Sequence, residues 1–130
     1  MLTESMSVPF TFTDLYGGFA EGTGIARLDP AGLILEFEVK EALFGLLKSD
    51  VRQVMIPTTE MASIDLAKGW LRTKIIVRTN SLRTASEVPG SQGAEIVLCV
   101  ARKHRALAQE LVSTLNLTLC AHHLKQMEDS

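Results

Sequence analysis

Residues that could bind a metal gather near the C-terminus. Cys120, His122 and His123 stand within four positions of one another, and thiolate and imidazole are the usual ligands of zinc. On a helix, however, neighbouring positions point in different directions, and a closed zinc site needs four convergent ligands. His104 is the one further histidine. We therefore expect no metal and no cofactor, and we interpret this segment as a solvated helix end.

Nucleophilic and phosphate-binding motifs are the next candidates for chemistry. Serines are frequent, but none stands in a nucleophile elbow, and no histidine has a convincing acidic partner. The glycines at 17, 18, 22 and 24 lack a phosphate-loop pattern and do not open a helix. Glycines within strands more often mark bulges or bends. We expect that the protein is not an enzyme, and we keep a small enzyme or ligand carrier as an alternative.

Two groups of basic residues could instead bind an anion or an acidic partner. Arg72, Lys74 and Arg78 share one face of an expected strand. Cross-strand pairing with acids such as Glu36, Glu38 or Asp65 is the alternative interpretation of that face.

The second basic group opens the expected C-terminal helix and consists of Arg102, Lys103, His104 and Arg105. The N-terminus of a helix already carries partial positive charge, which makes four basic residues there unfavourable unless an anion binds. Compensation by Glu87, Glu95 or solvent is the alternative.

One apolar segment has no clean periodicity, namely Leu43, Phe44, Gly45, Leu46 and Leu47. As a loop it would expose an apolar patch that favours a partner. Together with Trp70, which stands at an expected turn, it could form a homodimer face. As a strand it would belong to the core. We read residues 41–50 as a connection with some strand character.

Bulk properties limit the class of protein and of partner. The chain of 130 residues suits one domain, with a core over about 17–124 and loose ends at 1–8 and 126–130. A net charge of -2 and a pI of about 5.9 argue against nucleic acid as the main partner, although a local basic patch could exist. No signal peptide or apolar run long enough to span a membrane is present, so we expect a cytoplasmic location. Cys99 and Cys120 are expected to be small buried hydrophobes, with a disulfide as the alternative.

Periodicity predicts the elements that must position these residues. The turn at 29–32 precedes an alternating strand at 33–40. Further strands are expected at 51–56, 61–67, 70–79 and 82–85. In the strand at 70–79 the inward set is Leu71, Thr73, Ile75 and Val77. The strand at 95–101 is apolar on both faces, and we expect the helix at 103–124 to cover it. The apolar stripe of that helix is Ala108, Leu111, Val112, Leu115 and Leu119.

Several of these segments resemble the bacterial, GRAM-like branch of the pleckstrin-homology-like fold. The resemblance lies in residues 54–64, with an I-P-x-x-E-hydrophobic-x-x-I pattern, in the Gly69–Trp70 turn and in the strand at 73–78. It implies a mainly β, partly open barrel or sandwich of about seven antiparallel strands capped by one C-terminal helix. Phosphoinositide-binding members carry Lys and Arg around the first hairpin loop. Asp29-Pro30-Ala31-Gly32 has none, so we do not expect the usual headgroup site.

These observations favour a non-catalytic binding or scaffold module that acts through protein–protein contacts or self-association. The alternative is a domain that binds a membrane surface or an anionic ligand such as a phosphate or carboxylate.

Overall fold

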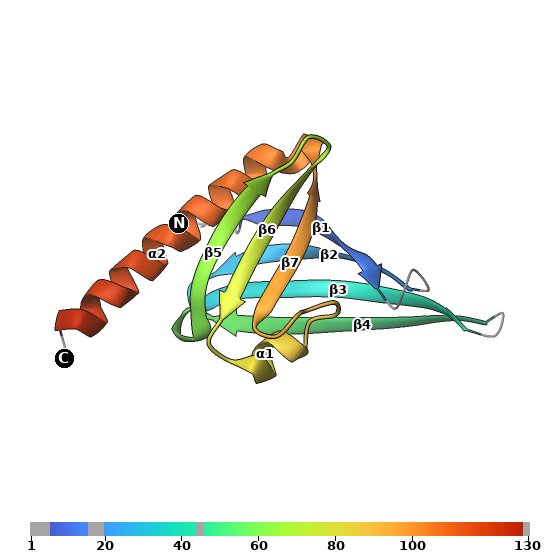
Figure 1. Ribbon diagram of the computed structural model, residues 1–130, viewed down its shortest axis with the longest axis horizontal. Coiled ribbons are helices and arrows are strands. Elements are labelled where there is room, and N and C mark those ends of the chain that lie inside the picture. Colours follow the sequence, from blue (N-terminus) through green and yellow to red (C-terminus); the bar gives the residue numbers. More distant parts are fainter. Residues whose placement is uncertain (1–5, 16–19, 44–45, 129–130) are drawn as a thin grey trace.

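The computed structural model describes residues 6–15, 20–43 and 46–128, which form a mainly β structure with a long C-terminal helix (Figure 1). Seven antiparallel strands make one open sheet in the order β4-β3-β2-β1-β7-β6-β5. The predicted architecture is confirmed. The strands are β1 (Ser7–Leu15), β2 (Ala20–Asp29), β3 (Gly32–Leu43), β4 (Leu46–Pro57), β5 (Met61–Lys68), β6 (Arg72–Thr79) and β7 (Glu95–Ala101). The helices are η2 (Thr58–Glu60), α1 (Leu82–Ser86), η3 (Arg102–His104) and α2 (Arg105–Glu128).

The core lies between two halves of the sheet. Figure 1 shows β5, β6 and β7 crossing over β1 to β4, so that the inner faces of the two groups oppose each other. Alternate residues of each strand fill the space between them, as a period of two requires. Phe12 of β1 meets Phe37 of β3 edge to face, with the ring centroids 5.3 Å apart. Other fully buried members include Val8, Leu33, Leu35, Ile56, Ile75, Val77, Ile96 and Leu98.

Helix α2 covers one end of this core with the predicted stripe, since all five expected residues are buried. Its main contact is with β5, and its contacts with β1, β6 and β7 are smaller. We expected the helix to cover the strand at 95–101 and thereby to explain its two apolar faces. That expectation is wrong as the main explanation, because α2 contacts β5 more than β7. Ile96, Leu98 and Val100 of β7 face the core. On the other face Cys99 is buried opposite Thr11 of β1, whereas Ala101 is exposed.

The described residues within 41–50 are strand rather than connection. β3 extends to Leu43 and β4 begins at Leu46, and these two residues are paired at the end of the hairpin where the chain passes from β3 to β4. The strand predicted at 51–56 is therefore the second half of a longer one. Leu47 lies opposite Ala42 in the same register. Phe44, the remaining apolar candidate, falls outside the described residues.

Three other expectations are corrected by the structure. Leu82–Ser86 is a short helix, because the Ser81 side chain accepts a hydrogen bond from the Thr84 backbone N–H at 3.2 Å. β6 begins at Arg72, so Leu71 lies in the turn and does not face the core. Ser7 and Val8 belong to β1, and Val8 is fully buried rather than loose.

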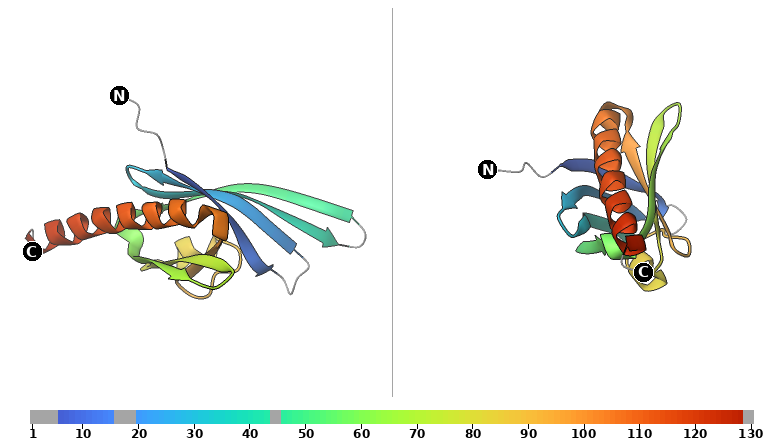
Figure 2. Two further views of the ribbon diagram at one scale, coloured as in Figure 1. Left: turned by 90° about the horizontal axis from the view of Figure 1, so that it is seen from above. Right: turned by 90° about the vertical axis from the view of Figure 1, so that its left-hand side faces the viewer.

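The C-terminal helix also differs from the expected 103–124. It begins at Arg105, after the single turn η3, and it continues to Glu128. Figure 2 shows its second half extending away from the sheet. Across the described ranges, no helix is both long and apolar enough to cross a bilayer.

One glycine of β2 is required by close packing. A Cβ built on Gly24 would contact the Glu36 carbonyl oxygen and would lie 2.7 Å from Phe37 Cβ and 2.8 Å from Phe10 Cζ. Gly22 and Gly24 thus belong to a paired strand, and Gly17 and Gly18 lie outside the described residues. The sequence suggested bulges or bends at such glycines, whereas Gly24 lies in continuous register and is needed for close packing.

We expect Leu115→Ala to lower the free energy of unfolding by about 2–5 kcal/mol, because it leaves a cavity beneath α2. Leu115 is 1% exposed, whereas Leu117 on the same helix is 74% exposed. Urea denaturation of both alanine variants measures the difference. A loss for Leu117→Ala as large as that for Leu115→Ala would contradict the packing described here.

Gly24→Ala should destabilise the protein by about 1–3 kcal/mol through overpacking. The neighbouring Thr23 is exposed, so Thr23→Ala is the matched control and should change stability by less than about 0.5 kcal/mol. Thermal unfolding followed by circular dichroism compares the two. Equal melting temperatures for Gly24→Ala and the unmodified chain would show that the close approach is not rigid.

Candidate functional site

The sheet brings the two basic groups of the sequence together. β6 and β7 are antiparallel neighbours, with Arg72 opposite Ala101 and Lys74 opposite Cys99. The beginning of β6 therefore lies beside the end of β7, where Arg102 follows. Figure 1 shows the β5–β6 turn next to the end of β7 and the start of α2. We call this surface the hairpin end. It comprises Lys68, Trp70, Leu71, Arg72, Lys74, Arg102, Lys103 and Arg105.

Two large apolar side chains stand in the β5–β6 turn. Trp70 is 87% exposed and Leu71 is 70% exposed. The turn is closed by a hydrogen bond of 2.9 Å from the Gly69 N–H to the Arg72 carbonyl oxygen. Because the turn lies beyond the last core-facing residues of both strands, most of each side chain stays in contact with water. Leu71 was missed as a site residue since alternation alone assigns it to the core.

Arg105 joins the start of α2 to the same turn. Its Nε donates to Thr73 Oγ1 at 2.8 Å, and one of its terminal nitrogens donates to the Gly69 carbonyl oxygen at 2.9 Å. Thr73 is fully buried, so the packed core fixes the position of the hydroxyl that Arg105 contacts. These acceptors compensate for part of the positive charge at the helix N-terminus. Arg105, predicted as an anion ligand, thus has a structural role in positioning the turn.

The other cations of the hairpin end face solvent. Lys68, Arg72, Lys74, Arg102 and Lys103 are all exposed, and none of them belongs to an ion pair found in the described part of the chain. Sequence reasoning did not select Lys68. One signal could have found the whole cluster: basic residues at the start of one strand meet those after the end of an antiparallel neighbour.

Arg78, the third member of the predicted stripe, has a different environment. Its guanidinium lies 3.3 Å from an Asp65 carboxylate oxygen and 3.3 Å from one of Glu95. The alternative of cross-strand pairing is therefore correct at this position. Glu36 and Glu38 pair instead with Arg27 and Lys40. The structure thus separates Arg78 from the exposed cations of the hairpin end.

Charge is distributed unevenly between this end and the rest of the chain. The hairpin end holds six of the 13 Lys and Arg residues, and no acid occurs within 66–74 or 96–109. The remaining seven cations accompany all 15 Asp and Glu residues. An acidic chain with net charge -2 thus has one strongly basic end.

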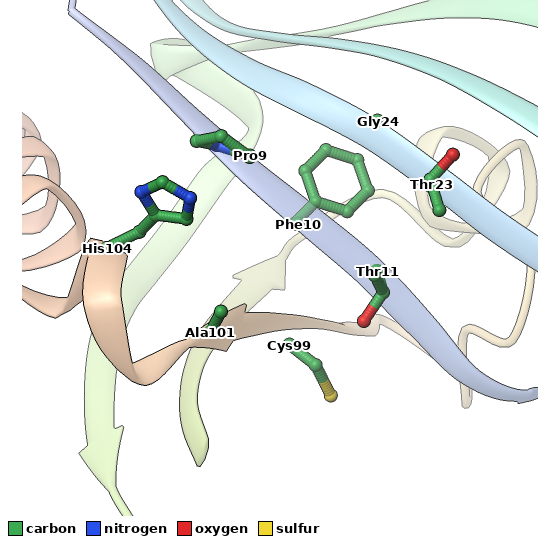
Figure 3. A pocket seen from close by; sticks show the side chains of 8 residues that line it. All are labelled: Pro9, Phe10, Thr11, Thr23, Gly24, Cys99, Ala101 and His104. Atoms are coloured by element: carbon green, nitrogen blue, oxygen red, sulfur yellow. The ribbon is translucent and has the colours of Figure 1, made fainter.

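A shallow hollow of about 250 Å³ lies beside the hairpin end, over β1, β2 and β7 (Figure 3). Figure 3 shows that the Cys99 thiol points away from the His104 ring, so the two do not form a nucleophile–base pair. The other lining residues are Pro9, Phe10, Thr11, Thr23, Gly24 and Ala101. This set holds no carboxylate and no second histidine.

The cysteines and the C-terminal histidines do not converge. Cys99 is buried as expected, whereas Cys120 is exposed, so the expectation of a buried residue is wrong there. No disulfide joins the two, so that alternative is wrong. The rings of His122 and His123 lie 6.2 Å apart at a tilt. Among the residues that the structure describes, no group of three or more His, Cys, Asp and Glu side chains is placed to hold a metal ion.

The apolar candidates fall at two separate places. Leu43, Leu46 and Leu47 stand where the chain passes from β3 to β4, whereas Trp70 stands at the β5–β6 turn. Figures 1 and 2 show these two ends far apart in the molecule. A single apolar face that combines them is therefore not formed within one copy of the chain.

No protein-family model matches the chain, and neither the curated proteins nor the solved structures contain a significant match. The resemblance to the pleckstrin-homology-like group stays a prediction.

Arg105→Met should loosen the β5–β6 turn, because it removes both hydrogen bonds to Gly69 and Thr73. Hydrogen bonds from charged groups contribute about 1.5–3 kcal/mol, so protection of amides in 68–74 from hydrogen exchange should fall accordingly. Arg102→Met is the control and should leave this protection unchanged. Equal exchange in the two variants would show that Arg105 does not hold the turn.

Proposed function

We propose that the protein is a non-catalytic binding module that contacts an anionic partner through the hairpin end. One observation carries this proposal: five exposed cations surround two exposed apolar side chains on a chain that is otherwise acidic. Contact with a partner would remove Trp70 and Leu71 from water while the cations meet opposite charge.

The physical cost of this surface in the free protein supports a binding role. Like charges so close together repel one another, and exposed Trp and Leu side chains stay hydrated. Neither feature helps folding, since the turn lies outside the core. Adjacent exposed apolar side chains within a polar rim are typical of interaction sites.

The architecture agrees with the pleckstrin-homology-like resemblance, which we retain as part of the proposal. In that fold, phosphoinositide-binding members use the first hairpin loop. In the structure the first hairpin is β1–β2, so the turn at 29–32, which the sequence suggested as the first hairpin loop, is the second one. Residues 16–19, between β1 and β2, include no Lys or Arg. The cations lie instead around the β5–β6 turn. We therefore place the binding surface at the hairpin end and not at that loop.

A column of immobilised heparin tests the charge part of the proposal. We expect the protein to be retained at neutral pH and low salt in spite of its net charge of -2, and to elute as salt screens the interaction. The double variant Arg102→Glu, Lys103→Glu should elute at markedly lower salt.

A charge-matched control separates local from global effects. Arg83 and Lys125 are exposed and lie outside the hairpin end, so Arg83→Glu, Lys125→Glu changes the net charge equally and should elute close to the unmodified chain. Equal losses in the two double variants, or no retention of the unmodified chain, would contradict the proposal.

A further inference from the structure

We infer that the anionic partner is the surface of a lipid bilayer, with Trp70 and Leu71 entering the headgroup region. This inference rests on the proposed function and adds the class of partner. Three observations support it: the shape of the β5–β6 turn, the cations around it, and the acidic charge of the rest of the chain.

The apolar side chains occupy a protruding point and not a groove. Trp70 and Leu71 are adjacent in the turn that ends the β5–β6 hairpin, and both are largely exposed. The hollow of Figure 3 does not include them. A protruding Trp fits the bilayer interface, where its amphipathic ring is favoured at headgroup level. A globular partner would need a matching pocket for the same side chain.

The cations flank this point and are spread over several elements. Lys68 ends β5, Arg72 and Lys74 lie on β6, and Arg102 and Lys103 lie on η3. Such a distribution matches a sheet of negative headgroups, because each Lys or Arg near an anionic membrane adds about 1 kcal/mol without precise geometry. A site for one small phosphate would need convergent donors instead.

The remaining charge would orient the molecule. Away from the hairpin end, seven cations accompany 15 acids, so an anionic surface repels the rest of the protein. An approach with the β5–β6 turn first brings attraction and apolar contact together. Arg105 holds that turn against the helix start, so little conformational entropy is lost when it meets the surface.

The single Trp residue of the chain makes the inference directly measurable. The unmodified protein would be mixed with vesicles of phosphatidylcholine alone and with vesicles that also contain phosphatidylserine. We expect sedimentation with the second kind only, together with a blue shift of the Trp70 emission and quenching by lipids brominated near the headgroup. Added salt should reverse the binding.

Variants separate insertion from adsorption by charge. Trp70→Ala, Leu71→Ala should weaken sedimentation with anionic vesicles by at least about tenfold, as burial of such side chains contributes about 1.5–3 kcal/mol each. Leu117 and Leu124 are also exposed but lie on α2, so Leu117→Ala, Leu124→Ala is the matched control and should bind unchanged. Arg72→Gln should weaken binding about fivefold. Unchanged urea midpoints would show that each variant is folded.

The outcomes distinguish this inference from the proposed function. Retention on heparin without sedimentation on anionic vesicles would overturn the membrane inference, leave the proposed function standing and favour an acidic protein as partner. Sedimentation without a blue shift, or with no loss in the Trp70 and Leu71 variant, would overturn the insertion of the turn. Failure on both heparin and vesicles would overturn both proposals.

Discussion

The antiparallel pairing of β7 with its two neighbours is the constraint on which the rest of the structure depends. Within the described part of the sheet, β7 joins the meander β1 to β4 to the hairpin β5–β6. Thr11 of β1 lies opposite Cys99, and Arg72 of β6 lies opposite Ala101. The joint brings the inner faces of the two halves together over one core. It also carries the chain from the sheet into α2.

The hairpin end follows from this joint. Because β7 ends where β6 begins, the basic residues after β7 meet those at the start of β6. The helix must begin there too, and Arg105 then reaches the Gly69 carbonyl oxygen and the Thr73 hydroxyl. A residue that is unfavourable at a free helix N-terminus thereby becomes the connection between helix and turn. The same geometry leaves Trp70 and Leu71 beyond the core and in water.

Much of the fold could be predicted from local patterns. Alternation in residues 33–39 and 73–77 correctly assigned inward and outward faces. The three- and four-residue spacing of Ala108, Leu111, Leu115 and Leu119 assigned the buried side of α2. The errors have physical causes. Ser81 caps a helix where a strand was expected, and Leu71 follows the alternation but lies past the edge of the core. In residues 41–50 the run from Ala42 to Leu47 has no polar residue that would mark a period of two, so the alternation used elsewhere gave no signal there.

The candidate site, like the fold, could be predicted only in those features that depend on local sequence. The sequence by itself determined which residues are basic, which are apolar and which face of each element they occupy, because periodicity is a local property of the chain. Only the tertiary structure decided that Arg72 and Arg102 belong to one surface, that Asp65 and Glu95 pair with Arg78, and that Arg105 serves the turn. These outcomes depend on which strands are neighbours and in which register. Such pairing joins residues distant in sequence, whereas the period of each strand indicates only which of its faces is buried.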